Sequence, residues 1–271
     1  MSDGSSLWPV YGGRSFNLWQ PDTGDYYAWA EPQPITTALQ QRRRRGQRNR
    51  RSAFSEFSRE WAECRETLPC LKPRIAFRDV TNRTNNRTVI AALVPGDRVI
   101  TNKGPYILWP SGSETDAAYL LGVLSSMILD WFARRIVELN LNFHIFNSLP
   151  IPRPELDDPD PGSPGIRLRT RVIHIAGRLA TAEPDHPGFR EWAAAVGVEA
   201  GSIGSEAEKN DLIEELDAVV ALLYGLDDAD LRVIYGTFHT GADYSERRRR
   251  VIGHCREWRE RLENGGPGGN S

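Results

Sequence analysis

Cysteine and lysine are scarce in this chain, which has three of each among 271 residues. Cys64, Cys70 and Cys255 show neither the spacing of a metal site nor a disulfide framework, and this fits a reducing compartment. The uncharged apolar stretch at residues 117–129 is too short to cross a bilayer. The first residues lack the charged start and apolar run of a signal peptide. These absences predict a cytoplasmic protein that does not associate with membranes.

Several motifs that carry chemistry are also missing. A nuclease of the Asp…Glu-x-Lys type needs a carboxylate two residues before a lysine, and none of the three lysines has one there. The sequence has no Walker loop, no zinc-ligand spacing and no Gly-x-Ser-x-Gly elbow. We therefore expect no catalytic residue, metal ligand or cofactor-binding residue in this chain.

The charge is unevenly distributed along the chain, although the net charge is only −2. Residues 1–150 contain 19 Lys and Arg against 14 Asp and Glu, and the remainder contains 15 against 22. Between residues 42 and 103 the count is 16 basic against 6 acidic. A segment of this kind can face the phosphates of a nucleic acid.

The stretch RIAFRDVTNRTNNR, residues 74–87, concentrates side chains that read DNA. Arg and Asn form bidentate hydrogen bonds with guanine and adenine edges, and Thr and Asn also bind phosphates. An apolar strand is predicted at residues 88–94, which would stiffen this segment. The candidate reading residues are Arg74, Arg78, Asn82, Arg83, Asn85, Asn86 and Arg87. The alternative is a polar hairpin whose Asn and Thr side chains only form turns.

Two further places are candidates for phosphate contacts. Arg43, Arg44 and Arg45 lie in a basic run over residues 42–51, where Gly46 suggests a flexible loop. Lys103 lies at the tip of a predicted hairpin turn. Taken alone, the basic run and Lys103 are equally consistent with an ordinary solvated surface. Their proximity in sequence to residues 74–87 favours contacts with phosphates.

Beyond composition, residues 74–95 follow the pattern R-x-x-F-R-D-x-T-N-x-T-N-x-R-T-x-I-A-A-L-x-P. Other segments of the chain occur in the same order as in one known family. They are YGGRSF at 11–16, a helix at 119–139, NFH at 142–144, LPIP at 149–152 and LYGL at 223–226. Together they resemble the C-terminal target-recognition region of Eco57I-like (type IIG) restriction–modification adenine-specific DNA methyltransferases. The resemblance covers most of residues 7–260.

The resemblance implies sequence-specific recognition of double-stranded DNA in a bacterial restriction–modification system that defends against phage. Such methyltransferases hold S-adenosylmethionine in a Gly-rich loop and grip the flipped base with an Asn/Asp-Pro-Pro-Tyr/Phe motif. Neither is present here. The catalytic methyltransferase or nuclease domain, with its S-adenosylmethionine, is therefore expected on another chain or in a lost part of the gene.

We expect an α+β fold in two parts. Residues 7–152 would form a β-rich target-recognition domain with a long helix from about Ser113 to Leu139. A Pro- and Asp-rich linker over 153–164 would lead to a helical domain over 165–262. Two other functions remain open: a protein-interaction scaffold without a DNA role, and a divergent DNA-modifying enzyme.

Overall fold

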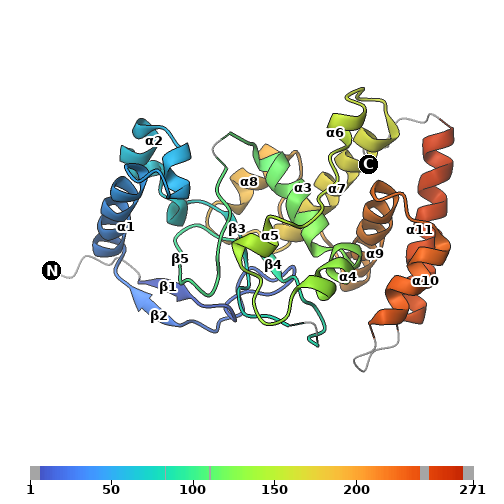
Figure 1. The fold of residues 1–271 in the computed structure, drawn as a ribbon, viewed down its shortest axis with the longest axis horizontal. Coiled ribbons are helices and arrows are strands. Elements are labelled where there is room, and N and C mark those ends of the chain that lie inside the picture. The colour runs from blue at the N-terminus through green and yellow to red at the C-terminus, as the bar shows by residue number, and fades with distance from the viewer. Residues whose placement is uncertain (1–6, 83, 110, 239–243, 265–271) are drawn as a thin grey trace.

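The computed structural model describes residues 7–82, 84–109, 111–238 and 244–264, and it is a mixed α+β structure in which helices predominate. Figure 1 shows the N-terminal strands with helices α1 and α2 at one end and helices α9, α10 and α11 at the other, with β3, β4, α3 and α7 between them. The strands are only two to four residues long. The expectation of a β-rich first part was therefore wrong.

Three short strands form the first sheet, in the order β2–β1–β5. The strands are β1 (Trp8–Tyr11), β2 (Ala28–Ala30) and β5 (Val99–Ile100). β2 pairs antiparallel with β1, as the aromatic hairpin predicted, and β5 pairs parallel with β1. Tyr11 of β1 and Phe16 are fully buried and belong to a small second core.

The basic run does not lie in a flexible loop, as the sequence suggested, but largely in a helix. Helix α1 (Pro32–Gln47) starts with prolines in its first turn and carries Arg44 and Arg45 in its last turn, where cations favour the negative end of the helix dipole. Arginine is also a good helix former, which explains why the run extends the helix. Short turns follow: η1 (Ala53–Glu56), α2 (Arg59–Glu63), η2 (Arg65–Thr67) and η3 (Pro69–Leu71). Residues 53–71 therefore form several short turns and no long helix.

A buried antiparallel pair, β3 (Arg74–Phe77) and β4 (Ala91–Val94), lies at the centre of the molecule. Every residue of both strands is buried. The strand predicted at residues 88–94 is confirmed for its second part only. A strand was expected at residues 106–109. In the structure, Tyr106 forms an isolated β-bridge with Ala76 of β3 instead.

The predicted long helix is broken in two. Helix α3 (Glu114–Ser125) begins with a capping box between Ser113 and Asp116, as the sequence indicated. The helix ends before Ser126, which has an extended backbone. The Ser126 side chain caps the next helix, α4 (Met127–Ile136), whose axis is bent by 68° from that of α3. Asn142 then caps a short helix, α5 (Phe143–Phe146), where the alternating pattern had predicted a strand. The sequence missed these breaks because apolar residues continue across Ser126.

The second half is helical, as predicted. Its helices are α6 (Pro154–Asp157), α7 (Pro164–Ala180), α8 (Phe189–Val196), α9 (Glu206–Leu223), α10 (Asp228–Thr237) and α11 (Ser245–Glu263). The predicted apolar stripes are buried, and Gly225 follows α9 with a φ of 69°. Helix α8 was not predicted.

The hydrophobic core does not divide at residues 153–164. One cluster of buried side chains extends from Ile75 in β3 to Trp258 in α11. Gly122 of α3 lies so close to α7 that a Cβ atom there would come within 2.5 Å of Val172 Cγ1. The boundary between domains 7–152 and 165–262 stays a prediction, and this shared packing argues against two independently folding units.

Within the described residues, no single helix is long and apolar enough to cross a membrane. The bent pair α3 and α4 passes the test of length and composition when both helices are taken together. Both helices contribute many buried side chains to the core just described.

Candidate nucleic-acid interface

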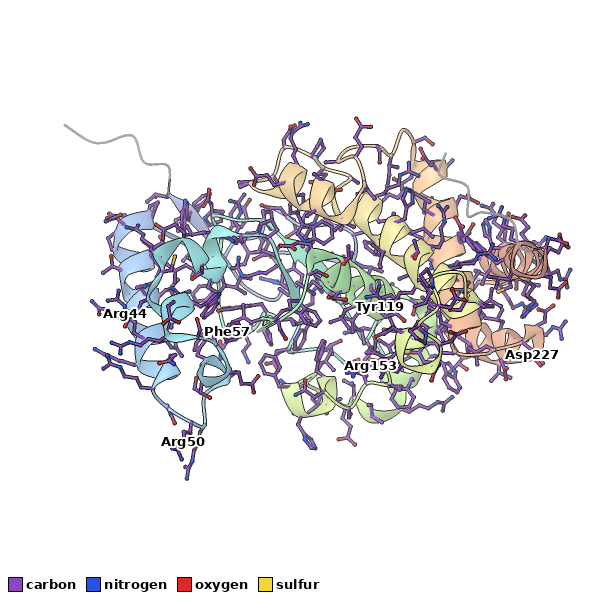
Figure 2. All side chains as sticks on the ribbon, turned by 90° about the horizontal axis from the view of Figure 1, so that it is seen from above. Arg44, Arg50, Phe57, Tyr119, Arg153 and Asp227 are labelled. Atoms are coloured by element: carbon purple, nitrogen blue, oxygen red, sulfur yellow. The ribbon has the colours of Figure 1, made fainter. Side chains whose placement is uncertain are left out.

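An exposed group of arginines surrounds the C-terminal end of α1. Arg42, Arg44, Arg45, Arg48, Arg50 and Arg51 are all exposed. None of them forms an ion pair with a described residue, although the Nη2 atom of Arg44 lies 3.5 Å from the carbonyl oxygen of Glu63. In Figure 2, Arg44 and Arg50 point outward from the unit formed by α1 and α2. Charges this exposed and unpaired are suited to contacts with phosphates.

The arginines of α11 differ from those of α1. Arg250, Arg256, Arg259 and Arg261 each lie within 3.5 Å of an Asp or Glu oxygen. Arg247 turns inward to the buried carboxylate of Asp217, with its Nη2 atom 2.7 Å from Oδ2. These charges are balanced within the protein, so the two arginine-rich helices are not equivalent.

Arg43 is not part of the exposed surface, contrary to the expectation from sequence. Its side chain is 2% exposed and its guanidinium lies over the ring of Trp61. It donates to the carbonyl oxygens of Ala62 and Cys64 and to Thr67 Oγ1. Burial also lowers the pKa of Arg43. We therefore assign Arg43 to the attachment of α1 to the α2 segment and not to DNA.

Three of the proposed reading arginines also turn inward. Arg74 is buried, donates to the carbonyl oxygens of Lys72 and Arg98, and has its pKa lowered by burial. Arg78 donates to the carbonyl oxygen of Phe16, and burial lowers its pKa as well. Arg87 donates to carbonyl oxygens at the C-terminal end of α3. All three side chains hold the protein together and do not reach outward to bases.

The loop between Asp79 and Val89 is nevertheless firmly built. The buried carboxylate of Asp130 accepts the backbone N–H groups of Thr88 and Val89, at 2.9 and 2.7 Å. Arg134, one turn further along α4, donates to the carbonyl oxygens of Asn85 and Asn86. Helix α4 therefore holds both the base and the tip of this loop.

The tip of the loop is exposed, and Asn85 Nδ2 lies 3.5 Å from Thr81 Oγ1 within it. Thr84, Asn85 and Asn86 are exposed. Asn82 is half-buried and accepts from the backbone N–H of Thr84, so it forms the turn that the alternative interpretation predicted. Arg83 lies outside the described residues. Of the proposed reading set, Asn85 and Asn86 are the described residues placed to meet a base edge.

Lys103 is exposed, as its predicted position at a turn required. Its Nζ atom lies 3.6 Å from Asp79 Oδ2 at the start of the same loop. Exposed pairs of this kind are weak. Lys103 therefore lies close to the polar loop. Its ammonium group can leave the Asp79 carboxylate and pair with a phosphate instead.

A cleft of about 300 Å³, which the sequence did not reveal, lies between the α2–η3 segment and the N-terminal end of α3. Four aromatic residues line it: Phe57, Trp61, Trp109 and Trp192. In Figure 2, Phe57 lies on the inner side of the α1–α2 unit, facing the body of the protein. The lining residues come from segments up to 135 positions apart, between Phe57 and Trp192, so no local pattern announces the site.

The described residues contain no group of three or more His, Cys, Asp or Glu side chains that could hold a metal ion. All three cysteines are free, with Cys64 exposed and Cys70 and Cys255 buried. Burial raises the pKa of both buried thiols. A buried thiol with a raised pKa is a poor nucleophile.

Comparison with known proteins gave no match to this chain among protein-family models, curated proteins or solved structures.

Proposed function

We propose that this protein recognises DNA for a bacterial adenine-specific restriction–modification methyltransferase whose catalytic domain lies on another chain or is lost. The proposal rests on the motif resemblance and on one structural observation, the six exposed arginines at the end of α1, none of which forms an ion pair with a described residue. A surface of this kind has a strong attraction for polyphosphate. The alternatives are a scaffold without a DNA role and a divergent DNA-modifying enzyme.

In this proposal the two surfaces have different roles. The exposed arginines of α1 contact phosphates without regard to sequence. The loop tip with Asn85 and Asn86 contacts base edges, because its backbone is held by Asp130 and Arg134 and a fixed backbone can keep an amide in register with a base. S-adenosylmethionine would bind to the catalytic partner.

The phosphate role is tested by fluorescence anisotropy on a labelled duplex over a salt series. A triple variant, Arg44→Gln, Arg45→Gln and Arg48→Gln, should weaken binding to all sequences alike and reduce the salt slope by about 0.9 for each phosphate that it no longer neutralises. The matched control removes the same charge from α11, at the other end of the molecule (Figure 1), through Arg249→Gln, Arg256→Gln and Arg261→Gln. Equal effects of the two triple variants, or no duplex binding by the wild type with its partner present, would sink the proposal.

The reading role needs a cognate site, which enrichment from a random duplex library supplies. Asn85→Ala and Asn86→Ala should each cost about 1–3 kcal/mol on the enriched sequence and much less on random DNA. Asn147→Ala changes an exposed Asn at the end of α5 and serves as the control. Equal losses on both duplexes would limit the loop to backbone contacts.

The enzyme alternative has a separate test. The purified chain is incubated with labelled S-adenosylmethionine and mixed-sequence duplex, and we expect no transfer of label. Transfer that survives purification to homogeneity would replace the proposal with the divergent enzyme. A chain that binds no duplex, alone or with its partner, would favour the scaffold.

A further inference from the structure

The aromatic cleft is a site that the proposed function does not use. Its floor is apolar and consists of Ile75 from β3, Leu93 from β4 and Ala117 from α3. Trp109, on the loop that precedes α3, lines the opening and is 39% exposed. A tryptophan this exposed beside an apolar floor offers a ring face to a planar ligand.

Of the aromatic residues that line the cleft, Trp109 is the best placed to stack. Trp61 is already stacked on Phe57 at 4.1 Å and covered by the guanidinium of Arg43 at 4.5 Å. Trp192 is 6% exposed. Gly112 lies against Trp109, where an added Cβ atom would come within 3.2 Å of the Trp109 Cβ atom. The loop is therefore closed tightly behind the Trp109 ring.

The cleft also contains positive charge that no described carboxylate balances. Arg74 lines it and is buried, yet its neighbours are two carbonyl oxygens and the ring of Tyr106 at 5.1 Å. Lys72 is exposed at the same cleft and forms no ion pair with a described residue. A buried unpaired cation creates a strong local potential because the surrounding dielectric is low. An electron-rich or anionic ligand would be favoured here.

One acidic side chain in the cleft favours a ligand that also carries a hydrogen-bond donor. Glu114, in the first turn of α3, also lines the cleft and forms no ion pair with a described residue. A carboxylate accepts hydrogen bonds from the exocyclic amino groups of nucleobases. Aromatic stacking, an amino-group acceptor and a nearby cation are together the features that bind a nucleobase and its phosphate.

We propose that this cleft binds a single nucleobase with its adjoining phosphate, the base stacked on Trp109 and the phosphate beside Lys72. The volume of about 300 Å³ is at the small end for ligand pockets, which suits one base. The α2 segment that carries Trp61 is attached to α1 through hydrogen bonds that Gln40 and Arg43 donate to the carbonyl oxygen of Ala62, so this wall of the cleft is held in place. The base can come from a nucleic-acid strand or from a free nucleotide.

The test uses 2-aminopurine, whose emission is quenched when it stacks on an aromatic ring. Three probes are titrated: a short single strand with one internal 2-aminopurine, the free 5′-monophosphate and the free nucleoside. We expect saturable quenching of the strand or of the monophosphate. Trp109→Ala should weaken that binding about tenfold or more, and Trp109→Phe should restore most of it. Trp29→Ala, which removes an exposed tryptophan from β2, is the control and should leave quenching unchanged.

Lys72→Gln separates the phosphate contact from the base contact. This variant should weaken binding of the monophosphate severalfold and leave binding of the nucleoside unchanged. Equal weakening of the binding of both probes would overturn the phosphate contact. Quenching that is absent with all probes, or that persists in Trp109→Ala while circular dichroism shows a folded protein, would overturn the site. Monophosphate binding as tight as strand binding would identify a free nucleotide as the ligand, and tighter strand binding would identify a base of a nucleic-acid strand.

This outcome is distinguishable from that of the proposed function. The salt-dependent anisotropy of the duplex is measured on the same protein preparation. Duplex binding without quenching of any probe would reject the cleft alone. Quenching of the monophosphate without duplex binding would reject DNA target recognition alone.

Discussion

The carboxylate of Asp130 in α4 accepts the backbone N–H of Thr88 at 2.9 Å, which joins the base of the polar loop to the helical core. The same oxygen accepts from Val89, and Asp130 also pairs with Arg87 and Arg134. Asp130 is completely buried, so these contacts are shielded from water.

Asp130→Ala should lower the free energy of unfolding by about 3–5 kcal/mol, because it removes a buried carboxylate that pairs with Arg87 and takes the acceptor from two buried backbone N–H groups. Urea unfolding measures the loss, and hydrogen exchange should show faster exchange of the Thr88 and Val89 amides. Asp185→Ala removes a carboxylate that is 94% exposed and should change stability by less than about 0.5 kcal/mol. Unchanged exchange at Thr88 and Val89 would contradict the anchoring role.

Arg43 and Arg44 are neighbours in the basic run with opposite predicted effects. Arg43→Ala should destabilise the protein by at least about 1.5–3 kcal/mol, because buried carbonyl oxygens of Ala62 and Cys64 lose a charged donor. The free energy of unfolding of Arg44→Ala should stay within about 0.5 kcal/mol of that of the wild type. This variant should weaken DNA binding instead. Thermal unfolding and anisotropy distinguish them. A stable Arg43→Ala protein with weakened DNA binding would return Arg43 to the phosphate surface.

Gly122→Ala should destabilise the protein by about 1–3 kcal/mol, since the added methyl group would meet Val172 Cγ1 at 2.5 Å. The matched control is Gly253→Ala in α11, where no atom lies within 4 Å of an added Cβ and a gain of up to about 1 kcal/mol is expected. Denaturant titration gives both values. A neutral Gly122→Ala variant would mean that α3 and α7 are less tightly packed than described.

The shared core makes a related prediction about the halves of the chain. A purified fragment 165–262 should lack a cooperative unfolding transition, because α7 loses the partner helix α3 against which it packs. Protease cleavage within residues 153–164 should leave the two pieces associated under native conditions. A fragment that unfolds cooperatively by itself would establish the two-domain division instead.

Stability should depend on pH through Glu215, which accepts from Arg171 at 2.8 and 2.6 Å and from Trp258 Nε1 at 2.9 Å. Desolvation raises the pKa of Glu215, but the bonds and charge of Arg171 outweigh it and hold the pKa below its usual 4.5. A carboxyl with a lower pKa in the folded state stabilises the protein above the pKa of the unfolded chain and loses that contribution as the pH falls through the folded value.

Glu215→Gln should therefore reduce the free energy of unfolding at pH 7, and its difference from the wild type should shrink as the pH falls below 4.5. Urea titrations at several pH values measure this trend. Glu246→Gln is the control, because Glu246 is 65% exposed and its pair with Arg250 contributes little. A difference that grows toward acid pH would show that the sign is wrong.

The sequence alone determined the features that depend on neighbouring residues. Ser113 and Asp116 sit three positions apart and form the capping box at the start of α3. Leu231, Ile234 and Tyr235 recur at helical spacing in α10, and all three are buried. These features follow from local hydrogen bonding and helical periodicity, which a short window of sequence contains.

Only the tertiary structure decided which way the arginines face. Arg43 and Arg44 are identical in type and adjacent, yet one is buried on Trp61 and the other is exposed, because a helix rotates successive side chains by about 100°. Arg74 and Arg87 turn inward because carbonyl oxygens of distant segments accept their hydrogens. The cleft at Trp109 likewise needs residues from several separate stretches of the chain to meet. Composition reveals the charge, but the packing of segments that are distant in sequence determines which charges remain for a ligand.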